Sequence, residues 1–266
     1  MSSKDVDAAE QEDPVPYGSS FTLEPYSENC RYVCGRREHV VFGVSPGNSY
    51  FRVSRLADLL RWLCEEFRRV DVVIPDSALH HTYLALGYSP ERAAKKVRSE
   101  TNVLRNRVLR GWELSGCPRD GNGLFLMSAL APRPSYQRLL AHVRSTLRED
   151  QDLRATAIRM TREALIARGL TGEPTAEQLE RGLQYLVAEL PFFIGSADIF
   201  EVPSSVCFYH RPIPLADVIF DHRSLLCPSP RQGYALISPT EPPAGETASA
   251  YGSGLHQRDA KEVNRT

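Results

Sequence analysis

Lysine is scarce in this chain of 266 residues: of 32 lysines and arginines, only Lys4, Lys95, Lys96 and Lys261 are lysines. The basic residues are therefore mostly arginines, which nearly balance 33 acidic residues and leave a formal net charge of −1. Arginine guanidinium groups suit phosphate and carboxylate ligands. Composition alone names no partner, so the placement of the arginines has to be considered.

The sequence also lacks a long apolar run, since none approaches the roughly 20 residues of a membrane-spanning helix. Its first residues, MSSKDVDAAEQEDP, are acidic and contain no apolar core, so they do not resemble a signal peptide. We therefore expect a cytoplasmic location without membrane association. Residues 1–20 and 238–266 have the polar compositions of disordered tails, which leaves a single domain over residues 21–237.

Paired cysteine motifs are missing as well. Cys30 and Cys34 lie close in sequence, but no second ligand pair follows at zinc spacing. We therefore predict no metal site and expect all the cysteines to be reduced thiols. The six are Cys30, Cys34, Cys64, Cys117, Cys207 and Cys227.

The segment HVVFGVSPGNSYF at residues 39–51 contains a short apolar strand, 40–44, that runs into turn-forming residues. A helix over 51–69 and a second apolar strand over 70–75 complete a β-α-β pattern, which favours a parallel sheet and an α/β fold. Ser45 then stands at the carboxyl end of an internal strand, where such sheets bind ligands. It could equally cap the following helix.

The rest of the chain continues this alternation of helices and strands. We expect residues 21–37 to be irregular. Pro191 should limit a helix that begins near residue 176. The other predicted elements are a helix over 89–112, a strand over 124–130, a helical region over 135–169 with a possible break at 150–152, a strand over 204–209, a helix over 214–222 and an edge strand over 234–237.

The predicted helix 89–112 has one apolar and one positive face. Its apolar stripe comprises Ala93, Val97, Thr101, Leu104 and Val108. The basic residues lie opposite or beside that stripe, and they are Arg92, Lys95, Lys96, Arg98, Arg105, Arg107 and Arg110. Solvated faces usually carry both signs of charge, so this face favours contact with a nucleic-acid phosphate backbone.

One reading of the Ser45 turn is a hydrolase. Residues 43–47 match GxSxG, the nucleophile elbow of α/β-hydrolases. Asp198 with His210, or Asp217 with His222, could complete a catalytic triad. Pro46 argues against this reading, because it occupies the position whose N–H should serve the oxyanion hole and proline has no N–H.

Three separated blocks resemble the cyclodipeptide synthases, which join two aminoacyl groups taken from aminoacyl-tRNAs into a diketopiperazine. The blocks are GVSPGNSYF at 43–51, YLVAELPFF at 185–193 and VPSSVCFYHRP at 202–212. The resemblance implies a single Rossmann-like domain with a mainly parallel sheet flanked by helices, similar to class I tyrosyl- and tryptophanyl-tRNA synthetase catalytic domains. The chain shows no HIGH or KMSKS signature, and we expect neither ATP nor a metal as cofactor.

The resemblance also implies roles for individual residues. Ser45 matches the nucleophile that accepts the first aminoacyl group in a ping-pong mechanism. Tyr185 and Glu189 match the pair that holds its ammonium group, and their i, i+4 spacing places both on one helical face. Asn48 and Tyr209 match residues that define one of the two main subgroups, with Tyr209 as a proton relay.

The same resemblance suggests which residues meet substrate. The predicted lining of the first aminoacyl pocket comprises Val41, Gly43, Val73, Phe192 and Cys207. His210, where that subgroup usually has glutamine, is a further predicted substrate-binding residue. The basic helix corresponds to the one that docks the first tRNA. We expect a monomer that uses two aminoacyl-tRNAs and no DNA; the sequence does not identify the two amino acids. A serine esterase and a non-catalytic tRNA-binding module are the alternatives.

Overall fold

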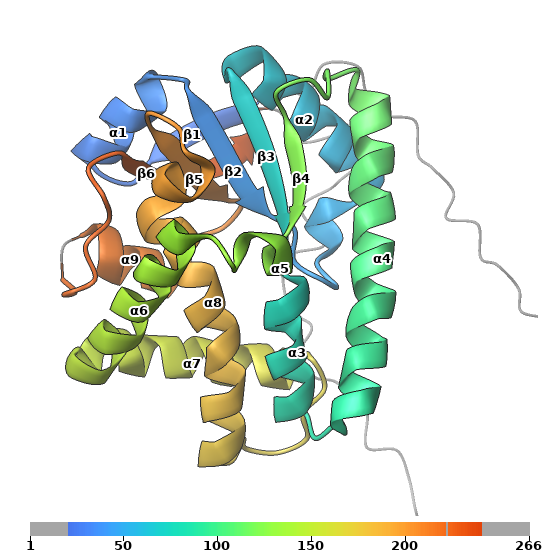
Figure 1. Ribbon diagram of the computed structural model, residues 1–266, viewed down its shortest axis with the longest axis vertical. Helices are drawn as coiled ribbons and strands as arrows, with labels where there is room; N and C mark the ends of the chain where they lie inside the picture. Colours follow the sequence, from blue (N-terminus) through green and yellow to red (C-terminus); the bar gives the residue numbers. More distant parts are fainter. Residues whose placement is uncertain (1–20, 222, 241–266) are drawn as a thin grey trace, which may run out of the picture.

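The computed structural model describes residues 21–221 and 223–240, and a six-stranded sheet lies at its centre (Figure 1). The strand order is β1-β6-β5-β2-β3-β4. The strands are β1 (Phe21–Pro25), β2 (His39–Gly43), β3 (Arg69–Ile74), β4 (Gly123–Leu126), β5 (Ser205–Tyr209) and β6 (Gln232–Pro239).

The described residues also form nine α-helices and one short 3₁₀ helix. Their bounds are α1 (Glu28–Gly35), η1 (Ser49–Phe51), α2 (Val53–Glu66), α3 (Asp76–Ala85), α4 (Pro90–Ser115), α5 (Met127–Leu130), α6 (Pro134–Glu149), α7 (Gln151–Ala167), α8 (Ala176–Phe200) and α9 (Pro214–Phe220). The predicted break in the helical region 135–169 is confirmed, because Asp150 ends α6 and its carboxylate caps α7 by accepting from the N–H of Leu153.

The predicted α/β class is confirmed. Strands β6, β5, β2, β3 and β4 pair in parallel, and β1 alone pairs antiparallel, with β6. The first β-α-β unit is β2-α2-β3, as the sequence pattern indicated. Since parallel strands share a direction, the carboxyl ends of β2, β3 and β5 meet at one edge of the sheet.

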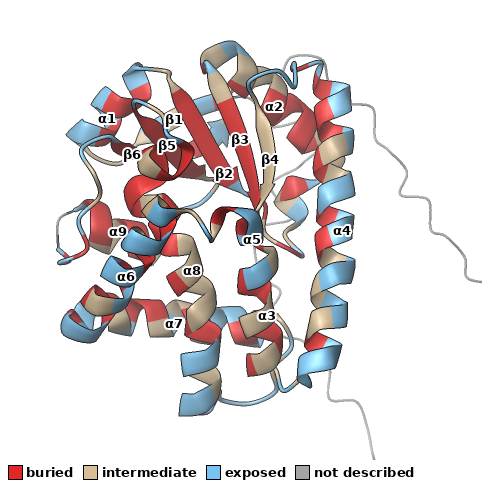
Figure 2. Cartoon of the chain, in the orientation of Figure 1, coloured by how far each residue is buried: buried red, intermediate tan, exposed pale blue. Residues whose placement is uncertain are grey.

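Helices cover both faces of the sheet, so most residues of its central strands β2, β3 and β5 are buried (Figure 2). Successive residues of β2 point to opposite faces. Val40 and Phe42 belong to the core shared with α2 and α4, whereas Val41 belongs to the core shared with α8. Helices α3, α4 and α8 extend beyond the carboxyl edge of the strands and flank the space below it (Figure 1).

The amino-terminal part of the domain was predicted wrongly as irregular. Residues 21–25 form β1, and residues 28–35 form α1, whose N-cap Ser27 accepts a hydrogen bond from the N–H of Cys30. The partner of β1 is β6, more than 200 residues away, so its pairing leaves little local signal. It also places β6 inside the sheet, so the prediction of an edge strand over 234–237 is wrong.

Two predicted element ends are also wrong. The expected strand 124–130 ends at Leu126, and Met127–Leu130 turns into α5. Helix α8 passes through Pro191 and continues to Phe200, with non-helical dihedral angles only at Gly195. The freed N–H of Ser196 donates to Oε1 of Gln232 at 2.7 Å, so the buried polar group at this kink is satisfied.

Helix α8 is a core helix, although its length and composition would allow a membrane span. Of the helices in the described residues, it is the one that is long and apolar enough to cross a membrane. However, 61% of its apolar stretch is buried inside the molecule. It packs against α3, α6 and α7 and against β5. Its apolar residues therefore face protein.

Helix α4 crosses α2 closely at Gly111. A Cβ at this position would lie 2.7 Å from the Cβ of Leu56, closer than real side chains approach. The glycine therefore lets the two backbones meet. This contact holds the carboxyl half of α4 against the sheet layer, while its amino-terminal half extends past α3 (Figure 1).

The expectation of six reduced thiols is wrong for one pair. Cys64 on α2 and Cys117 after α4 form a disulfide, with their Cα atoms 6.0 Å apart. The close packing of α2 on α4 brings these residues together, and their separation of 53 positions hides the pairing in the sequence. The other four cysteines are free, and only Cys227 is exposed.

The predicted tails fall largely outside the described residues. Residues 1–20 and 241–266 are not described, and neither is His222. Strand β6 continues through Pro239, which pairs with Phe21, so the domain extends beyond the predicted boundary at residue 237.

Candidate active site

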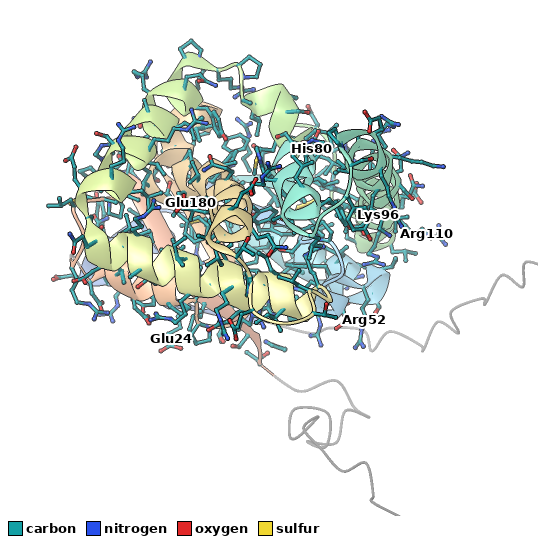
Figure 3. All side chains as sticks on the ribbon, turned by 90° about the horizontal axis from the view of Figure 1, so that it is seen from below. Glu24, Arg52, His80, Lys96, Arg110 and Glu180 are labelled. Carbon is teal, nitrogen blue, oxygen red and sulfur yellow. A yellow bond between two sulfur atoms is a disulfide. The ribbon has the colours of Figure 1, made fainter. Side chains whose placement is uncertain are left out.

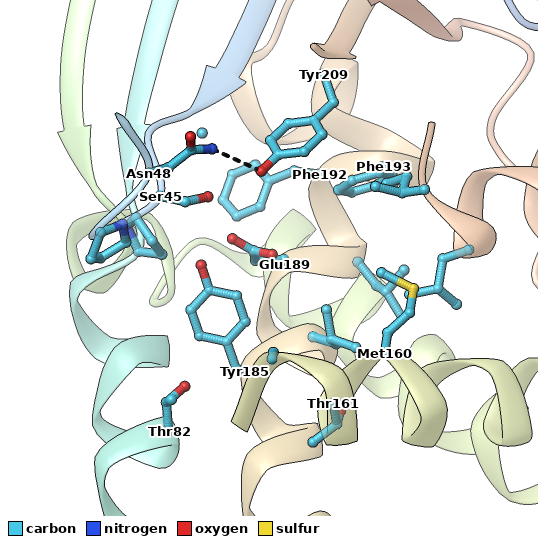
Figure 4. A pocket seen from close by; sticks show the side chains of 18 of the residues that line it. Ser45, Asn48, Thr82, Met160, Thr161, Tyr185, Glu189, Phe192, Phe193 and Tyr209 are labelled. Atoms are coloured by element: carbon cyan, nitrogen blue, oxygen red, sulfur yellow. Dashed lines mark hydrogen bonds between the residues drawn. The ribbon is translucent and has the colours of Figure 1, made fainter. Parts of the chain in front are cut away.

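A cavity of about 900 Å³ opens at the carboxyl edge of the parallel strands, between the sheet and helices α7 and α8 (Figure 4). Five residues predicted from separate sequence blocks line it together, and they are Ser45, Asn48, Tyr185, Glu189 and Tyr209. Ligand sites of α/β proteins favour this edge. The fold therefore gathers residues up to 164 positions apart around one space.

Ser45 follows β2 in a tight turn. The N–H of Val44 still donates to the carbonyl of Val73 at 3.0 Å, so the strand register holds up to the serine. The carbonyl of Ser45 then accepts from the N–H of Asn48 at 3.3 Å, and Gly47 adopts the left-handed φ of +75° that this turn needs. The half-buried serine is thus presented at the cavity by the turn.

Asn48 connects this turn to the end of β5. Its amide Nδ2 donates to the hydroxyl of Tyr209 at 3.2 Å, while its Oδ1 accepts from the N–H of Tyr50 at 3.0 Å and caps η1. The expected capping role and the contact with Tyr209 are therefore both present. Because β2 and β5 are parallel neighbours, their ends bring the two side chains together.

Tyr185 and Glu189 project from one face of α8, and Figure 4 shows their oxygens in the same space as the Ser45 hydroxyl. Burial raises the pKa of Glu189 to about 7, although a hydrogen bond with Tyr185 and the charge of Arg168 favour the carboxylate. Burial, and then the neighbouring Glu189, raise the pKa of Tyr185 well above its ordinary value. A neutral phenol and a carboxyl group that titrates near neutrality thus stand side by side.

Arg168, which the sequence did not single out, is a further element of this site. It follows α7, lines the cavity, and donates from Nη2 to the carbonyl of Pro46 at 2.9 Å. Its charge also lowers the pKa values of Tyr185 and Glu189. One guanidinium thus contacts the serine turn and acts on the α8 pair. No spacing pattern marks it, because it stands alone at a helix end.

The residues predicted for the first aminoacyl pocket all border the cavity, namely Val41, Gly43, Val73, Phe192 and Cys207. They come from β2, β3, α8 and β5. His210 is not among the described residues that line the cavity, and its predicted substrate contact stays a prediction. Its ring stacks on Tyr50 with centroids 4.0 Å apart, and burial, followed by the charge of Arg211, lowers its pKa to about 4.

The hydrolase reading with Asp198 and His210 finds no support in this geometry, and His222 of the alternative pair lies outside the described residues. No histidine is among the described residues that line the cavity with Ser45. Asp198 pairs with Arg231 instead of His210. Pro46 lies in the turn as expected and provides no N–H for an oxyanion.

A Ser–His–Asp chain does exist, but inside the sheet. Nδ1 of His39 lies 2.7 Å from Oγ of Ser205, and its Nε2 lies 3.1 Å from Oδ2 of Asp71. All three residues are at most 1% exposed, so no substrate can reach them. Burial lowers the pKa of His39. This network satisfies buried polar groups and belongs to the core.

The predicted helix of basic residues is α4, and its apolar stripe packs inward as expected: Ala93, Thr101, Leu104 and Val108 are buried. Figure 3 shows Lys96 and Arg110 on its outer side. The helix runs three residues further than predicted and includes Glu113, which pairs with Arg110 at 3.3 Å, while Lys96 pairs with Glu100 at 3.5 Å. The seven predicted basic residues all lie on α4, and all but Arg107 are exposed. Lys96 and Arg110 form ion pairs with glutamates, and the guanidinium of Arg92 lies over the ring of Tyr88.

Among the residues that the structure describes, no three His, Cys, Asp or Glu side chains gather as metal ligands would. The prediction that no metal or ATP is needed remains untested by this observation.

Comparison with known proteins places the whole domain in one family. A family model for cyclodipeptide synthase matches residues 21–239. Cyclo(L-leucyl-L-leucyl) synthase of Bacillus subtilis is 35% identical over 82% of this chain and 89% of its own length. Cyclo(L-tyrosyl-L-tyrosyl) synthase of Mycobacterium tuberculosis is 34% identical over 84% of this chain and 78% of its own.

Solved structures agree with the sequence comparison. A crystal structure of a cyclo(L-leucyl-L-phenylalanyl) synthase superposes with a TM-score of 0.76 and 28% identity, over 84% of this chain and all of that one. A Mycobacterium tuberculosis structure, described as relating cyclodipeptide synthetases to type I tRNA synthetases, gives a TM-score of 0.71 and 32% identity over 85% of this chain and 96% of that one. The predicted Rossmann-like, synthetase-related fold is therefore confirmed, and the chain belongs to the cyclodipeptide synthases, enzymes that form cyclic dipeptides.

Proposed function

We propose that this enzyme makes a cyclic dipeptide from two aminoacyl-tRNAs by ping-pong acyl transfer through Ser45. The observation that carries the proposal is the convergence of Ser45, Tyr185, Glu189 and Tyr209 on one cavity without a histidine among its described lining residues. An aminoacyl-tRNA is already an activated ester, so its acyl transfer to serine does not require the full triad that hydrolyses unactivated substrates.

In the first half-reaction, the Ser45 oxygen attacks the ester carbonyl of the first aminoacyl-tRNA. The bond from that carbonyl to the ribose oxygen breaks, and the tRNA leaves with a hydroxyl group that takes up the proton lost by the serine. The Glu189 carboxylate and the Tyr185 oxygen hold the α-ammonium group of the bound amino acid. The new ester then keeps the aminoacyl group in the cavity.

In the second half-reaction, the amine of the second aminoacyl-tRNA attacks the seryl ester and forms a peptide bond. This releases the Ser45 oxygen from the first carbonyl and leaves a dipeptide on the second tRNA. Transfer of that dipeptide to Ser45 forms a dipeptidyl-enzyme and releases the second tRNA. Attack by the free amine of the dipeptide on its own ester closes the six-membered ring and regenerates the serine.

Tyr209 and Glu189 are the proposed proton carriers. The hydroxyl of Tyr209 accepts a hydrogen bond from Asn48, which fixes its oxygen while leaving its own proton to donate. A Glu189 pKa of about 7 suits the transfer of a proton from an ammonium group near neutral pH. The reaction as proposed consumes neither ATP nor a metal, and we place the enzyme in the cytoplasm as a monomer.

The test incubates the purified protein with aminoacyl-tRNAs and analyses products and intact protein by mass spectrometry. We expect diketopiperazines, and an aminoacyl adduct on Ser45 when a single aminoacyl-tRNA is supplied. Ser45→Ala should abolish both. Ser54→Ala, a nearby substitution outside the cavity, should change neither. Binding of tRNA without turnover for any proteinogenic aminoacyl-tRNA would overturn the proposal.

A further inference from the structure

A second cavity, of about 440 Å³, lies beside the first, between α3, the amino-terminal half of α4 and the segment after α7. We name it the Tyr88 cavity. Its main polar and aromatic lining residues are Tyr83, Tyr88, Lys96, Glu100, Arg168 and Thr171. Arg168 lines both cavities, and Thr82 of the first adjoins Tyr83 of the second. The two spaces therefore share a wall.

The Tyr88 cavity contains two tyrosine rings in contact, and an arginine side chain packs on one of them. The guanidinium of Arg92 lies over the Tyr88 ring, 4.7 Å from its centroid, and the ring of Tyr83 meets Tyr88 edge-on at 5.2 Å. These contacts hold the Tyr88 side chain in place. An ordered tyrosine ring beside cationic side chains is the kind of surface on which unpaired nucleic-acid bases stack.

The charges around this cavity suit a nucleotide. Lys96 and Arg168 supply positive charge for a phosphate. Glu100 accepts a hydrogen bond from the hydroxyl of Tyr83 and pairs through Oε1 with Lys96. Its other oxygen, Oε2, is buried and has no hydrogen-bond partner among the described residues. The carboxylate thus keeps an unused acceptor in a site that is otherwise rich in donors.

We propose that the Tyr88 cavity binds the unpaired cytidine next to the 3′-terminal adenosine of the substrate tRNA, an inference that rests on the proposed function. The base stacks on Tyr88, its exocyclic amine donates to Glu100, and its phosphate lies between Lys96 and Arg168. Carboxylates accept from the cytosine N4 amine, whereas uracil has no exocyclic amine to offer. Since Arg168 separates the two cavities, the adjoining terminal adenosine reaches the cavity that holds Ser45.

The experiment measures single-turnover acylation of Ser45 by intact-protein mass spectrometry. The substrates are two aminoacyl-tRNAs, made by ligating aminoacylated pCpA or pUpA to a tRNA that lacks its last two nucleotides. We expect Tyr88→Leu to lower the second-order acylation rate about tenfold, the scale of one lost base stack, and Tyr88→Phe to stay within about twofold. Acylation by a small activated ester of the same amino acid should be equal in all three proteins.

Glu100→Gln tests recognition of the base. The wild-type enzyme should use the uridine-containing substrate about tenfold less well than the cytidine-containing one, and Glu100→Gln should remove most of that preference. Thr171 is exposed, so Thr171→Trp should fill the cavity without disturbing the core. We expect it to lower the acylation rate as much as Tyr88→Leu does. Thermal melting of each variant checks that the fold is intact.

The inference is overturned if folded Tyr88→Leu and Thr171→Trp are acylated by aminoacyl-tRNA at the wild-type rate. It is also overturned if their acylation rate with the small ester falls as much as their rate with aminoacyl-tRNA. If the wild-type protein forms no acyl-enzyme, the proposed function fails separately. Fluorescence titration with the oligonucleotides ACCA and ACUA then still decides the inference, because only a cytidine site prefers ACCA and loses that preference in Glu100→Gln.

Discussion

The side-chain amide of Asn48 donates to the hydroxyl of Tyr209 at 3.2 Å, although 161 positions separate the two residues. The same side chain caps η1 through its oxygen. One asparagine therefore fixes both the turn that carries Ser45 and the phenol proposed as the proton relay. Capping uses the side-chain oxygen of Asn48 and the contact with Tyr209 uses its nitrogen, so substitutions can separate the two roles.

Asn48→Ser should keep the cap and lose the contact with Tyr209, because serine is a good N-cap but its side chain is shorter. We expect the free energy of unfolding to change by less than about 0.5 kcal/mol and product formation to fall at least tenfold. Asn48→Ala should lose both functions and cost about 1 kcal/mol of stability. Urea denaturation and a diketopiperazine assay measure the two effects.

Tyr209→Phe provides the matched control, since it removes the hydroxyl and leaves the cap. Its activity should fall at least as far as that of Asn48→Ser, and the double variant should be no less active than Tyr209→Phe alone. Independent, multiplying losses would show that the hydrogen bond does not couple the two residues.

The charge of Arg168 should set the pH dependence of Ser45 acylation. In the proposed mechanism the carboxylate form of Glu189 holds the ammonium group, and burial raises the pKa of Glu189 to about 7. Acylation should therefore rise with pH around a midpoint near 7. Arg168→Gln removes a charge that favours the carboxylate, so this midpoint should move to higher pH.

Arg168→Lys keeps a positive charge while losing the guanidinium, so its midpoint should stay near that of the wild-type enzyme even if its rate falls. Rapid-quench acylation from pH 5.5 to 8.5 gives the profiles. Coincident midpoints for the wild-type and Arg168→Gln enzymes would contradict the assigned electrostatic role.

Glu189→Gln should inactivate the enzyme and yet stabilise its fold above neutral pH. The folded-state pKa of Glu189 is raised above the ordinary value of 4.5 to about 7. The folded protein thus binds the proton more tightly than the unfolded chain, and this group lowers stability progressively as pH rises from about 4.5 to 7. The gain in Glu189→Gln should be on the order of 1–3 kcal/mol at pH 8 and vanish near pH 4.5.

Denaturant unfolding at the two pH values checks this prediction. Glu177→Gln on the exposed first turn of α8 is a control for the loss of one acidic charge. A destabilised Glu189→Gln at pH 8 would mean that the interactions of the carboxylate with Tyr185 and Arg168 outweigh its burial.

The parallel part of the fold was predictable because its signals are local. Strand β2, helix α2 and strand β3 follow one another with short connections, so apolar runs and turn residues mark them. Strand β1 is stabilised by β6 at the other end of the domain, and helix α8 tolerates Pro191 because tertiary packing surrounds it. Single-sequence patterns do not report such long-range effects.

The candidate site divides in the same way. Ser45 stands at a recognisable strand end, and Tyr185 and Glu189 share a helical face, so pattern and family resemblance together identified them. Arg168 becomes part of the site only because the end of α7 meets the Ser45 turn. A single arginine at a helix end forms no sequence pattern from which a role in the site could be predicted.

Neutralising the exposed residues Lys95, Arg98 and Arg105 of α4 should weaken tRNA binding. None of the three forms an ion pair within the described residues, so each is free to contact a phosphate, whereas Lys96 and Arg110 each pair with a glutamate. Each lost phosphate contact lowers the slope of log K against log salt by about 0.7–0.9, so the triple glutamine variant should lose about 2–3 units of slope. Binding is measured by filter retention between 50 and 200 mM salt.

The matched control neutralises Arg138, Arg148 and Arg159, three exposed arginines of α6 and α7. It changes net charge equally and should leave the slope nearly unchanged. Equal changes of slope in the two triple variants would show that tRNA binding depends on the net charge of the protein and not on the α4 surface.

The last prediction concerns the cysteines. Thiol titration of the native protein should find one fast-reacting group, because Cys227 is exposed while Cys30, Cys34 and Cys207 are buried. Burial, followed by the neighbouring Cys30, also raises the pKa of Cys34 to about 12, which further suppresses its thiolate. Unfolding without reductant should expose four thiols, and unfolding with prior reduction six.

Cys227→Ser should lower each of those counts by one and abolish the fast phase. Reducing the Cys64–Cys117 bond should lower the free energy of unfolding by up to about 4 kcal/mol, since it closes a loop of 53 residues. Cys64→Ala should be equally destabilised and insensitive to reductant. Six reactive thiols in the unfolded, unreduced protein would instead mean that the pair is not oxidised, and that the close packing of α2 on α4 holds the two sulfurs together without a bond.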